Sequence, residues 1–385
     1  MDLNVDPILL ELRDRVAEFV RVDVIPAESE PLTPELIEEL RAKARRAGVF
    51  GPQLPPEHGG LGLGTVGMCV VFEQAGRSFL GPLAMHCSAP DEGNMHLLAH
   101  HATEAQREQY LKPLIEGKIR SCFALTEPAP GAGSDPTMLT TTATRVDGGW
   151  EITGRKWFAT GADGAAFAVT LAVTDPDADR HHRATMFLVP TDTPGYRFIR
   201  NVPVMGGHEV YGHGEIAFEN VRVPDSAVIG DVGDGFRLAM ARLGPARLTH
   251  CMRWMGVAQR SMDIAIEYAK QRTAFGKKLT EQQAIQWMIA DSEIELHASR
   301  LMVLNAAWEH ENGSEIRHES SICKVFVAEA VNRVIDRAVQ ICGALGYSGD
   351  TPLEMFFREA RAFRIYDGPS EVHRMVIARN LLRET

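Results

Sequence analysis

The sequence predicts an α+β fold in three parts, of which the first and last are helical and the middle is made of strands. Apolar residues recur every three or four positions from about residue 7 to 121 and again from Phe236 onward, as in amphipathic helices. Between about 122 and 229 they alternate or form short apolar runs bounded by turn residues. We therefore expect a helical domain at 1–121, a β domain at 122–230 and a helical bundle at 231–385.

The composition is that of an ordinary globular protein. The chain has 385 residues, of which 45% are hydrophobic and 24% are charged, so a disordered, collagenous or coiled-coil chain is excluded. Lys plus Arg number 40 and Asp plus Glu number 51, which gives a formal net charge of −11. Such a chain repels nucleic acid and anionic lipid unless it carries a basic face, and the sequence gives no sign of one. We expect neither nucleic acid nor a membrane among its partners.

The cysteines and the N-terminus indicate a cytoplasmic protein. The six cysteines are far apart, form no CxxC pair and lie mostly in apolar runs, which predicts buried free thiols and no metal site. The first residues are acidic, whereas a signal or transit peptide would be basic. No apolar run reaches the ~18 residues that a membrane helix needs.

The first part predicts several helices joined by turns. Leu9, Leu12, Val16 and Phe19 have the spacing of one buried helix face. Thr33 precedes Pro34 as a helix N-cap would. The glycine-rich stretch 59–64 follows two prolines and no strand, so we interpret it as a tight turn between helices rather than as a dinucleotide fingerprint. Further helices are expected at 66–75 and 94–101.

The middle and last parts differ in the period of their apolar residues. Six short segments are predicted as strands, which favours a small barrel or sandwich: 140–146, 150–153, 167–173, 185–190, 196–200 and 215–223. From Phe236 onward, two apolar stripes predict long helices packed side by side, as in a bundle. The stripes are Met252, Met255, Ala258, Met262, Ala265 and Ala269, and then Ile322, Val325, Phe326, Val331, Val334, Ile335, Ala338, Val339 and Cys342.

Three clusters carry residues suited to chemistry. In the first, a strand through Phe123 runs into a turn with Thr126 that would offer N–H groups and hydroxyls to an anion or a ring edge. In the second, Phe158 and Thr160 would stack on a planar ring and bond its edge, although core aromatics are the alternative. In the third, Asp367 precedes a Gly-Pro turn, where burial would raise its pKa and strengthen it as a base. A helix N-cap is the alternative there.

Taken in order, these clusters and further segments resemble the acyl-CoA dehydrogenase family over nearly the whole chain. The matching segments are 56–62, 125–128 with 131–135, 272–276 with 283–285, 339–347 and 366–368. Segments 88–95, 243–247 and 367–373 are similar to the branch of family members ten and eleven, whose members carry Asp as the base. Asp367 is therefore identified as a position match for the catalytic base.

The resemblance implies a fold, an activity and a set of partners. The fold is an N-terminal helical domain, a middle β-barrel and a C-terminal four-helix bundle. The activity is oxidation of an acyl-CoA thioester to the trans-2-enoyl-CoA, with FAD as cofactor and an electron-transfer flavoprotein as electron acceptor. Asp367 would take the α-proton while the flavin takes the β-hydride, and Gly368 would lie against the substrate. Since one FAD would be shared by two chains, a homodimer or homotetramer is expected.

The resemblance also implies which residues hold the ligands. Within one chain the cofactor would contact Phe123, Leu125, Thr126, Gly133, Ser134, Phe158 and Thr160, with Ser134 also beside the substrate. From a neighbouring chain it would contact Arg272, Phe275, Gln282, Gln283, Gln340, Gly343 and Ala344, with Arg272 on the pyrophosphate. Arg247 and Arg379 are the candidates for the phosphates of CoA.

Some positions depart from the common family pattern, and two other functions remain open. The segment from Thr126 to Ser134 is longer than usual, Phe158 replaces a Trp, Gln282 a His and Ala344 a Gly, while Pro369 and Glu371 stand where Thr and Gln often contact FAD. One alternative is a flavin oxidase on the same fold, similar to nitroalkane oxidase, which also has an Asp base. The other is a non-catalytic binding member of the fold.

Overall fold

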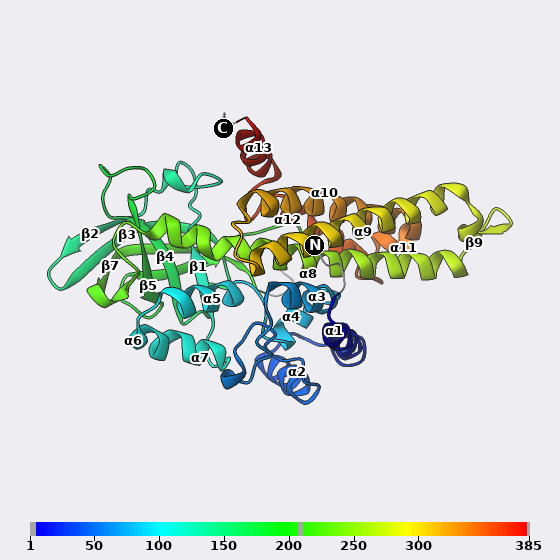
Figure 1. Cartoon of the computed structure of the whole chain (residues 1–385), viewed down its shortest axis with the longest axis horizontal. Coiled ribbons are helices and arrows are strands. Elements are labelled where there is room, and N and C mark those ends of the chain that lie inside the picture. Colours follow the sequence, from blue (N-terminus) through cyan, green and yellow to red (C-terminus); the bar gives the residue numbers. More distant parts are fainter. Residues whose placement is uncertain (1–4, 207–210, 383–385) are drawn as a thin grey trace. The chain divides into compact units, whose positions relative to one another are not determined.

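The computed structural model describes residues 5–206 and 211–382, which fold into two compact units (Figure 1). One unit joins Met1–Met85 with Gly244–Thr385, and the other is His86–Leu243. The mixture of helices with an eight-stranded and a two-stranded sheet confirms the predicted α+β class. The three domain boundaries remain predictions, because the two units follow packing rather than order along the chain.

The first unit begins with helices that match the sequence pattern. Leu12, Val16 and Phe19 are buried on one face of the first helix. Thr33 caps the second, since its Oγ1 accepts a hydrogen bond from the N–H of Leu36 at 3.2 Å. The helices are α1 (Pro7–Phe19), α2 (Pro34–Arg46), α3 (Thr65–Ala75) and α4 (Gly81–Ala84), with short π or 3₁₀ turns at Val20–Val24, Pro26–Ser29 and Pro56–His58.

The glycine-rich stretch 59–64 is a tight turn, as predicted. Gly59 and Gly62 have φ values of 76° and 61°, in the left-handed region that glycine adopts without strain. A Cβ on Gly60 would lie 2.2 Å from the carbonyl oxygen of Leu54. Close backbone packing therefore explains these glycines without a bound nucleotide.

The rest of the first unit is built from long helices that lie side by side (Figure 1). In the centre, α10 packs against α9, α12 and α13. Glu73 of α3 is nearly buried and pairs with Arg300 of α9 at 2.6 Å, which ties the N-terminal helices to the bundle. The helices are α8 (Gly235–Gln271), whose residues from Gly244 onward belong to this unit, α9 (Gln283–Glu311), α10 (Arg317–Cys342), α11 (Ala344–Tyr347), α12 (Leu353–Phe363) and α13 (Ser370–Leu381), with the short strands β9 (Thr273–Ala274) and β10 (Lys277–Lys278) and a 3₁₀ turn at Leu279–Glu281.

The two predicted apolar stripes have different outcomes. All six residues of the α8 stripe, from Met252 to Ala269, are buried. On α10 the C-terminal half of the stripe is mostly buried, whereas Ile322, Val325 and Phe326 are only half-buried. Lys324 is fully buried between them, because its ammonium reaches backbone carbonyls inside the unit. A lysine with internal acceptors has thus taken a core position that an apolar pattern cannot predict.

The second unit contains short helices and one twisted sheet (Figure 1). The strand order is β6-β7-β3-β2-β4-β5-β8, and β1 pairs with β4 in parallel. The helices are α5 (Asp91–His101), α6 (Glu104–Gln106), α7 (Lys112–Ile115), a π turn at Arg107–Leu111 and 3₁₀ turns at Pro136–Met138 and Asp225–Ala227. The strands are β1 (Ser121–Ala124), β2 (Thr142–Val146), β3 (Gly149–Thr160), β4 (Phe167–Val173), β5 (Ala184–Pro190), β6 (Tyr196–Asn201), β7 (His213–Pro224) and β8 (Val228–Ile229).

The third strand is longer than the sequence pattern predicts. It continues from Gly149 to Thr160, whereas the expected strand ends at residue 153. Register shifts against β7 occur between Ile152 and Gly154 and again between Lys156 and Ala159. Such bulges break the alternation of apolar and polar residues, which is the signal used to find strands.

The cysteines match expectation. All six cysteines are buried and unbridged. Within the part of the chain that the structure describes, no helix is long and apolar enough to span a bilayer.

Candidate active site

Asp367 lies in the turn between α12 and α13, and its main chain has an unusual conformation. Its φ is 54°, in the left-handed region that Asp tolerates better than most residues, and the φ of Gly368 is 97°. The carbonyl oxygen of Asp367 accepts hydrogen bonds from Arg247 Nε at 3.2 Å and from His373 Nε2 at 3.0 Å. These two donors come from α8 and α13, so two helices fix the peptide that follows the predicted base.

A third helix holds the same turn from the other side. Lys324 Nζ of α10 donates to the carbonyl oxygens of Phe363 at 2.7 Å and Gly368 at 3.3 Å. A Cβ on Gly368 would lie 2.5 Å from His373 Nε2, so this position has no room for a larger residue. Hydrogen bonds to its carbonyl oxygens therefore hold the turn, and its close packing requires glycine at position 368.

The carboxylate of Asp367 lies beside a histidine that the sequence analysis did not identify. His250 Nδ1 of α8 is 2.5 Å from Asp367 Oδ2, and the two side chains are 15% and 18% exposed. The separation is that of an ion pair, but the contact lacks the directional geometry of a hydrogen bond. The His250 ring also stands edge-on to the ring of Tyr366, with centroids 5.7 Å apart. The only sequence signal would have been its place one turn after Arg247, on the same helix face.

Burial and positive charge both affect the groups around Asp367. Burial lowers the pKa of Arg247 and of Lys324, while the nearby Asp367 charge opposes this in each case. Burial lowers the pKa of His373 to about 4, with the Arg247 charge adding to the effect, so this histidine is neutral at pH 7. Burial likewise raises the pKa of Tyr366, whose hydroxyl accepts a hydrogen bond from Trp254 Nε1. Two cations thus accompany one carboxylate in a poorly solvated setting.

The two arginines proposed for CoA phosphates have different environments. Arg247 is mostly buried and contacts the backbone of Asp367. Arg379 is exposed near the C-terminal end of α13, where its guanidinium contacts Met375 Sδ at 3.7 Å. The structure therefore brings Arg247, but not Arg379, to the predicted base.

In the second unit, the predicted cofactor loop after β1 is fixed by a buried ion pair. Glu127 Oε1 accepts from Lys156 Nζ at 2.8 Å, and the two side chains are 1% and 0% exposed. Glu127 Oε2 accepts from the N–H and hydroxyl of Thr140, both at 2.7 Å, and Lys156 also donates to the Leu125 carbonyl oxygen at 3.0 Å. The loop is thereby held against β3.

The two ionised groups of this pair are stabilised unequally. Burial alone would raise the pKa of Glu127, but the Lys156 charge and hydrogen bonds from Lys156, Thr140 and Thr141 bring it down to about 2. Burial lowers the pKa of Lys156 to about 8, and attraction to Glu127 only partly offsets this. Glu127 is therefore ionised at pH 7. Burial of the charged Lys156 costs free energy, which the attraction to Glu127 partly offsets.

The loop leaves several predicted cofactor residues accessible. Thr126 is half-buried, with its carbonyl oxygen accepting from the Trp157 N–H at 2.9 Å, and Ser134 is exposed. A Cβ on Gly133 would meet nothing within 4 Å. Phe123 is instead covered by a guanidinium, since Arg242 lies 4.1 Å above its ring.

Phe158 and Thr160 lie in the last part of β3, at or just after the second bulge. Phe158 has a φ of 50° and is 42% exposed, which is unusual for a large apolar residue. Its ring centroid lies 4.9 Å from Trp157 and 5.8 Å from His213. Thr160 Oγ1 is 2.9 Å from His213 Nδ1. An accessible aromatic face beside hydroxyls fits a planar ring with polar edges, so the residues present are compatible with a flavin.

The remaining predicted cofactor residues lie far from Asp367 within the first unit. Gln340 follows Lys324 by 16 positions on α10, which corresponds to about 24 Å along the helix. Arg272 and Phe275 lie in the hairpin of β9 and β10, where Phe275 is 100% exposed with a φ of 52°. The other residues are exposed or half-buried and lie at the start of α9 or just after the end of α10: Gln282, Gln283, Gly343 and Ala344. One chain therefore does not bring these residues together with Asp367.

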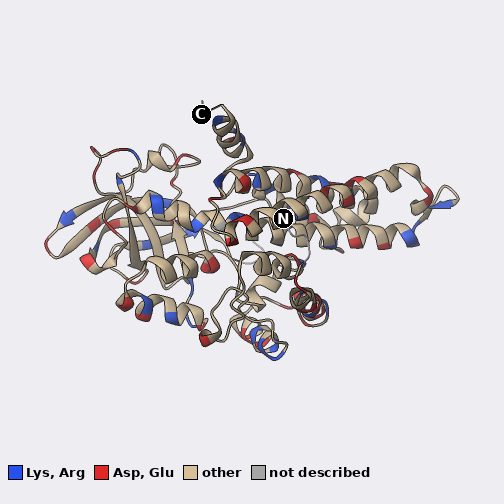
Figure 2. Cartoon of the chain, in the orientation of Figure 1, with Lys and Arg blue, Asp and Glu red and all other residues tan. Residues whose placement is uncertain are grey.

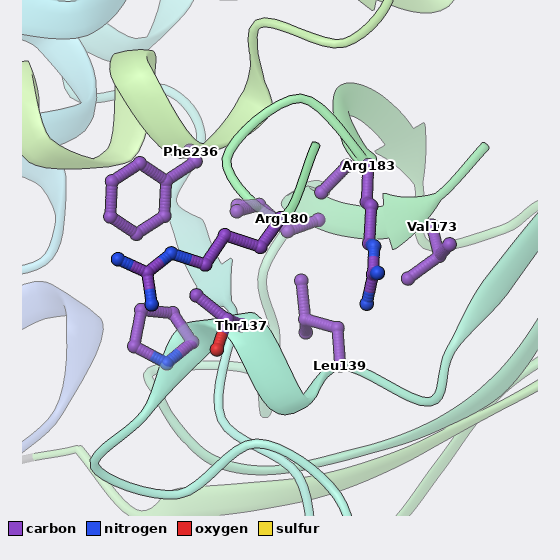
Figure 3. Close-up of a pocket in the computed structure, with 9 residues that line it drawn as sticks. Thr137, Leu139, Val173, Arg180, Arg183 and Phe236 are labelled. Carbon is purple, nitrogen blue, oxygen red and sulfur yellow. The ribbon is translucent and has the colours of Figure 1, made fainter. Parts of the chain in front are cut away.

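A separate surface hollow lies in the second unit (Figure 3). Arg180 and Arg183 enter it from the β4–β5 turn, and Phe236 closes one side with its ring stacked on His181 at 4.6 Å. The other lining residues are Pro136, Thr137, Leu139, Leu171, Val173 and Ala184. None of the lining residues is among the predicted ligand contacts.

Across the described residues, no cluster of three His, Cys, Asp or Glu side chains could hold a metal ion.

Comparison with known protein families gives three matches along the chain. Residues 9–118 match the N-terminal domain model of acyl-CoA dehydrogenases, residues 122–221 match the middle domain and residues 233–382 match the C-terminal domain.

Individual relatives agree with this result. The chain is 39% identical to a probable acyl-CoA dehydrogenase, FadE2, of Mycobacterium tuberculosis, with 98% of this chain and 96% of the relative covered. It is 38% identical to mouse acyl-CoA dehydrogenase family member 10, covering 99% of this chain but 37% of that protein. A solved putative acyl-CoA dehydrogenase of Mycobacterium abscessus has a TM-score of 0.93 at 39% identity, with 99% of each chain covered. The predicted likeness to the branch of members ten and eleven is thus confirmed.

Proposed function

Because this chain belongs to the acyl-CoA dehydrogenase family of FAD-dependent oxidoreductases, we propose that it oxidises an acyl-CoA thioester to the trans-2-enoyl-CoA. The observation that carries this proposal is the carboxylate of Asp367, held in a turn that three helices fix. A base that removes a weakly acidic α-proton must be ionised and accurately placed. The neighbouring charges of Arg247 and Lys324 favour an ionised carboxylate, and the clamped backbone supports its placement.

In this proposal Asp367 takes the proton from the α-carbon of the substrate. FAD, when bound, accepts the hydride that leaves the β-carbon. The N–H of Asp367 stabilises the charge that grows on the thioester oxygen, since the left-handed φ of Asp367 fixes the direction of this group. We assign Arg247 to the thioester end of the substrate, because it is buried against Asp367, and the exposed Arg379 to the CoA phosphates.

We assign the cofactor contacts of one chain to the accessible residues of the second unit. Thr126 bonds the ring edge, Phe158 and Thr160 flank the ring, and Ser134 lies at the pyrophosphate. Leu125 and Gly133 complete the loop around them. Phe123 contributes less directly, since Arg242 already covers its ring.

The remaining contacts come from a second copy, which makes the protein a homodimer or homotetramer. Arg272, Phe275, Gln340 and Gly343 cannot reach a flavin at Asp367 of their own chain, because about 24 Å of α10 lies between Lys324 and Gln340. An exposed apolar stripe supports association. It runs along α9 at intervals of seven residues, through Trp287, Ile294, Leu301 and Trp308, which are 62%, 65%, 40% and 39% exposed.

In this acidic chain, individual basic residues rather than the net charge must attract the anionic ligands. Lys and Arg are interspersed with Asp and Glu along the helices rather than gathered on one element (Figure 2). Individual arginines such as Arg272 therefore have to hold the phosphates of FAD and CoA. We further propose that an electron-transfer flavoprotein reoxidises the reduced enzyme, as in the family.

An anaerobic screen of acyl-CoA thioesters of different length and branching tests the function. We expect at least one of them to bleach the flavin absorbance and to yield the enoyl-CoA, with slow reoxidation in air. Rapid turnover to hydrogen peroxide would indicate an oxidase instead. A purified protein that cannot be reconstituted with FAD would indicate a non-catalytic member of the fold.

The shared cofactor site has its own test in the variant Arg272→Ala. Loss of a bidentate phosphate partner should lower FAD occupancy after purification and shift the oligomer towards smaller species. Lys277→Ala removes another exposed cation from the same hairpin and should leave both unchanged. Equal FAD content and equal mass in the two variants would refute a shared site.

A further inference from the structure

The backbone and the side chain of Asp367 are held by different groups. Arg247, Lys324 and His373 bind carbonyl oxygens of Asp367 or of residues in the same turn, so they fix the main chain. His250 Nδ1 instead lies against the side chain, 2.5 Å from Oδ2 of the carboxylate.

His250 belongs to one face of α8 that is directed at this turn. Arg247, His250 and Trp254 follow at intervals of three and four residues, which puts them on the same side of the helix. Each contacts a different part of the segment: Arg247 the carbonyl of Asp367, His250 its carboxylate, and Trp254 the hydroxyl of Tyr366. The edge-on packing of the imidazole against Tyr366 limits its rotation, so the nitrogen is held near Oδ2.

We propose that His250 is a positioning residue for the base, which engages Oδ2 of Asp367 and thereby sets the orientation of the carboxylate that receives the α-proton. The inference rests on the proposed dehydrogenation. The proton moves from the α-carbon to the carboxylate as the C–H bond breaks, two electrons leave the β-carbon as hydride to the flavin, and His250 neither gains nor loses a proton in this step.

Two substitutions separate the possible roles of the ring. His250→Phe keeps an aromatic ring against Tyr366 but has no nitrogen, whereas His250→Asn retains an N–H close to the Nδ1 position. His100→Asn, on an exposed face of α5, is the matched control. All variants are purified with FAD and compared by anaerobic stopped-flow reduction with the best thioester of the screen.

We expect His250→Phe to lower the rate constant of flavin reduction at pH 7 about 100-fold, as misplacement of a catalytic group does, with KM changed less than threefold. His250→Asn should recover to within about tenfold of the parent protein. His100→Asn should reduce at the rate of the parent protein. A rate for His250→Phe within twofold of the parent protein, or a rate for His250→Asn no higher than that of His250→Phe, would overturn the proposal.

A measurement without substrate keeps this inference separate from the proposed function. The ring ¹⁵N resonances of His250, assigned by their absence in His250→Asn, should shift when Asp367→Asn is introduced, while those of His100 do not. Unchanged His250 resonances would overturn the pairing even if acyl-CoA is oxidised. A clear shift in a protein that no acyl-CoA reduces would retain the pairing and reject the function.

Discussion

The substitution Glu127→Gln should destabilise the protein far more than an ordinary carboxylate substitution. It preserves the shape of the side chain and one acceptor oxygen but removes the negative charge opposite the ammonium of Lys156, which is 0% exposed, and places an amide NH2 where Oε2 accepts from the N–H and hydroxyl of Thr140. Removal of one partner from a buried ion pair costs about 3–5 kcal/mol. The pKa of Glu127 gives a similar magnitude, because a decrease from 4.5 to about 2 corresponds to about 3 kcal/mol.

Because the pKa of Lys156 is lowered, the whole ion pair contributes less to the free energy of unfolding than the loss of one partner would suggest. Burial of the ammonium costs more than the attraction to Glu127 returns. The double variant Glu127→Gln/Lys156→Met should therefore lose only about 1–2 kcal/mol, less than Glu127→Gln alone. Chemical unfolding of the FAD-loaded protein at pH 7, followed by circular dichroism, measures Glu127→Gln, Lys156→Met and the double variant in one cycle.

A surface pair on the same strand provides the control. Glu151 pairs with Arg222 at 2.9 Å, but the arginine side chain is 75% exposed, so Glu151→Gln should cost less than about 1 kcal/mol. The reasoning would be refuted if Glu127→Gln cost no more than Glu151→Gln, or if the double variant were as unstable as the sum of its single changes.

The turn that carries Asp367 leads to two further predictions. His373 has a folded pKa of about 4 against an ordinary 6.5, so the stability that it contributes is complete above pH 6.5 and is lost as the pH falls towards 4. His373→Gln should therefore flatten the decline of the unfolding midpoint between pH 6.5 and 4.5, and an unchanged slope would contradict the assignment. Gly368→Ala should lower the free energy of unfolding by about 1–3 kcal/mol, because φ is 97° and the new Cβ would lie 2.5 Å from His373 Nε2. Gly368→Ala should also slow flavin reduction. Gly313→Ala is the control, because Gly313 has a φ of 83° and open space around it, so its lower free energy of unfolding would measure backbone strain without a steric clash.

Features that depend on local periodicity could be predicted from the sequence. The buried face of α1, the Thr33 cap and the α8 stripe follow from spacing alone, since each involves residues within a few turns of one another. The β class of the middle part also followed from period and turn residues. The extension of β3 to Thr160 could not, because two bulges interrupt the alternation.

The environment of the base depends on residues that are distant in sequence. His250 and Asp367 are separated by 117 positions but lie in contact, and no periodic signal connects them. Glu127 and Lys156 are 29 positions apart and meet only through the fold of the loop onto β3. Both residues of this second pair lie within the clusters that the sequence analysis selected, yet their charges act on each other and not on a ligand. Identification of Asp367 itself depended on resemblance rather than on its local pattern, which fits a helix N-cap equally well.

The variant Asp367→Asn tests the central claim most directly. The amide keeps the size of the side chain but cannot accept the α-proton, so anaerobic mixing with a thioester that bleaches the parent protein measures the role of the base. The account predicts full FAD occupancy with flavin reduction slowed at least about 1,000-fold, within the range that loss of a general base produces. Asp336→Asn, an exposed position on α10, should reduce at the rate of the parent protein. A rate for Asp367→Asn within tenfold of the parent protein, at equal FAD occupancy, would contradict the assignment of Asp367 as the base.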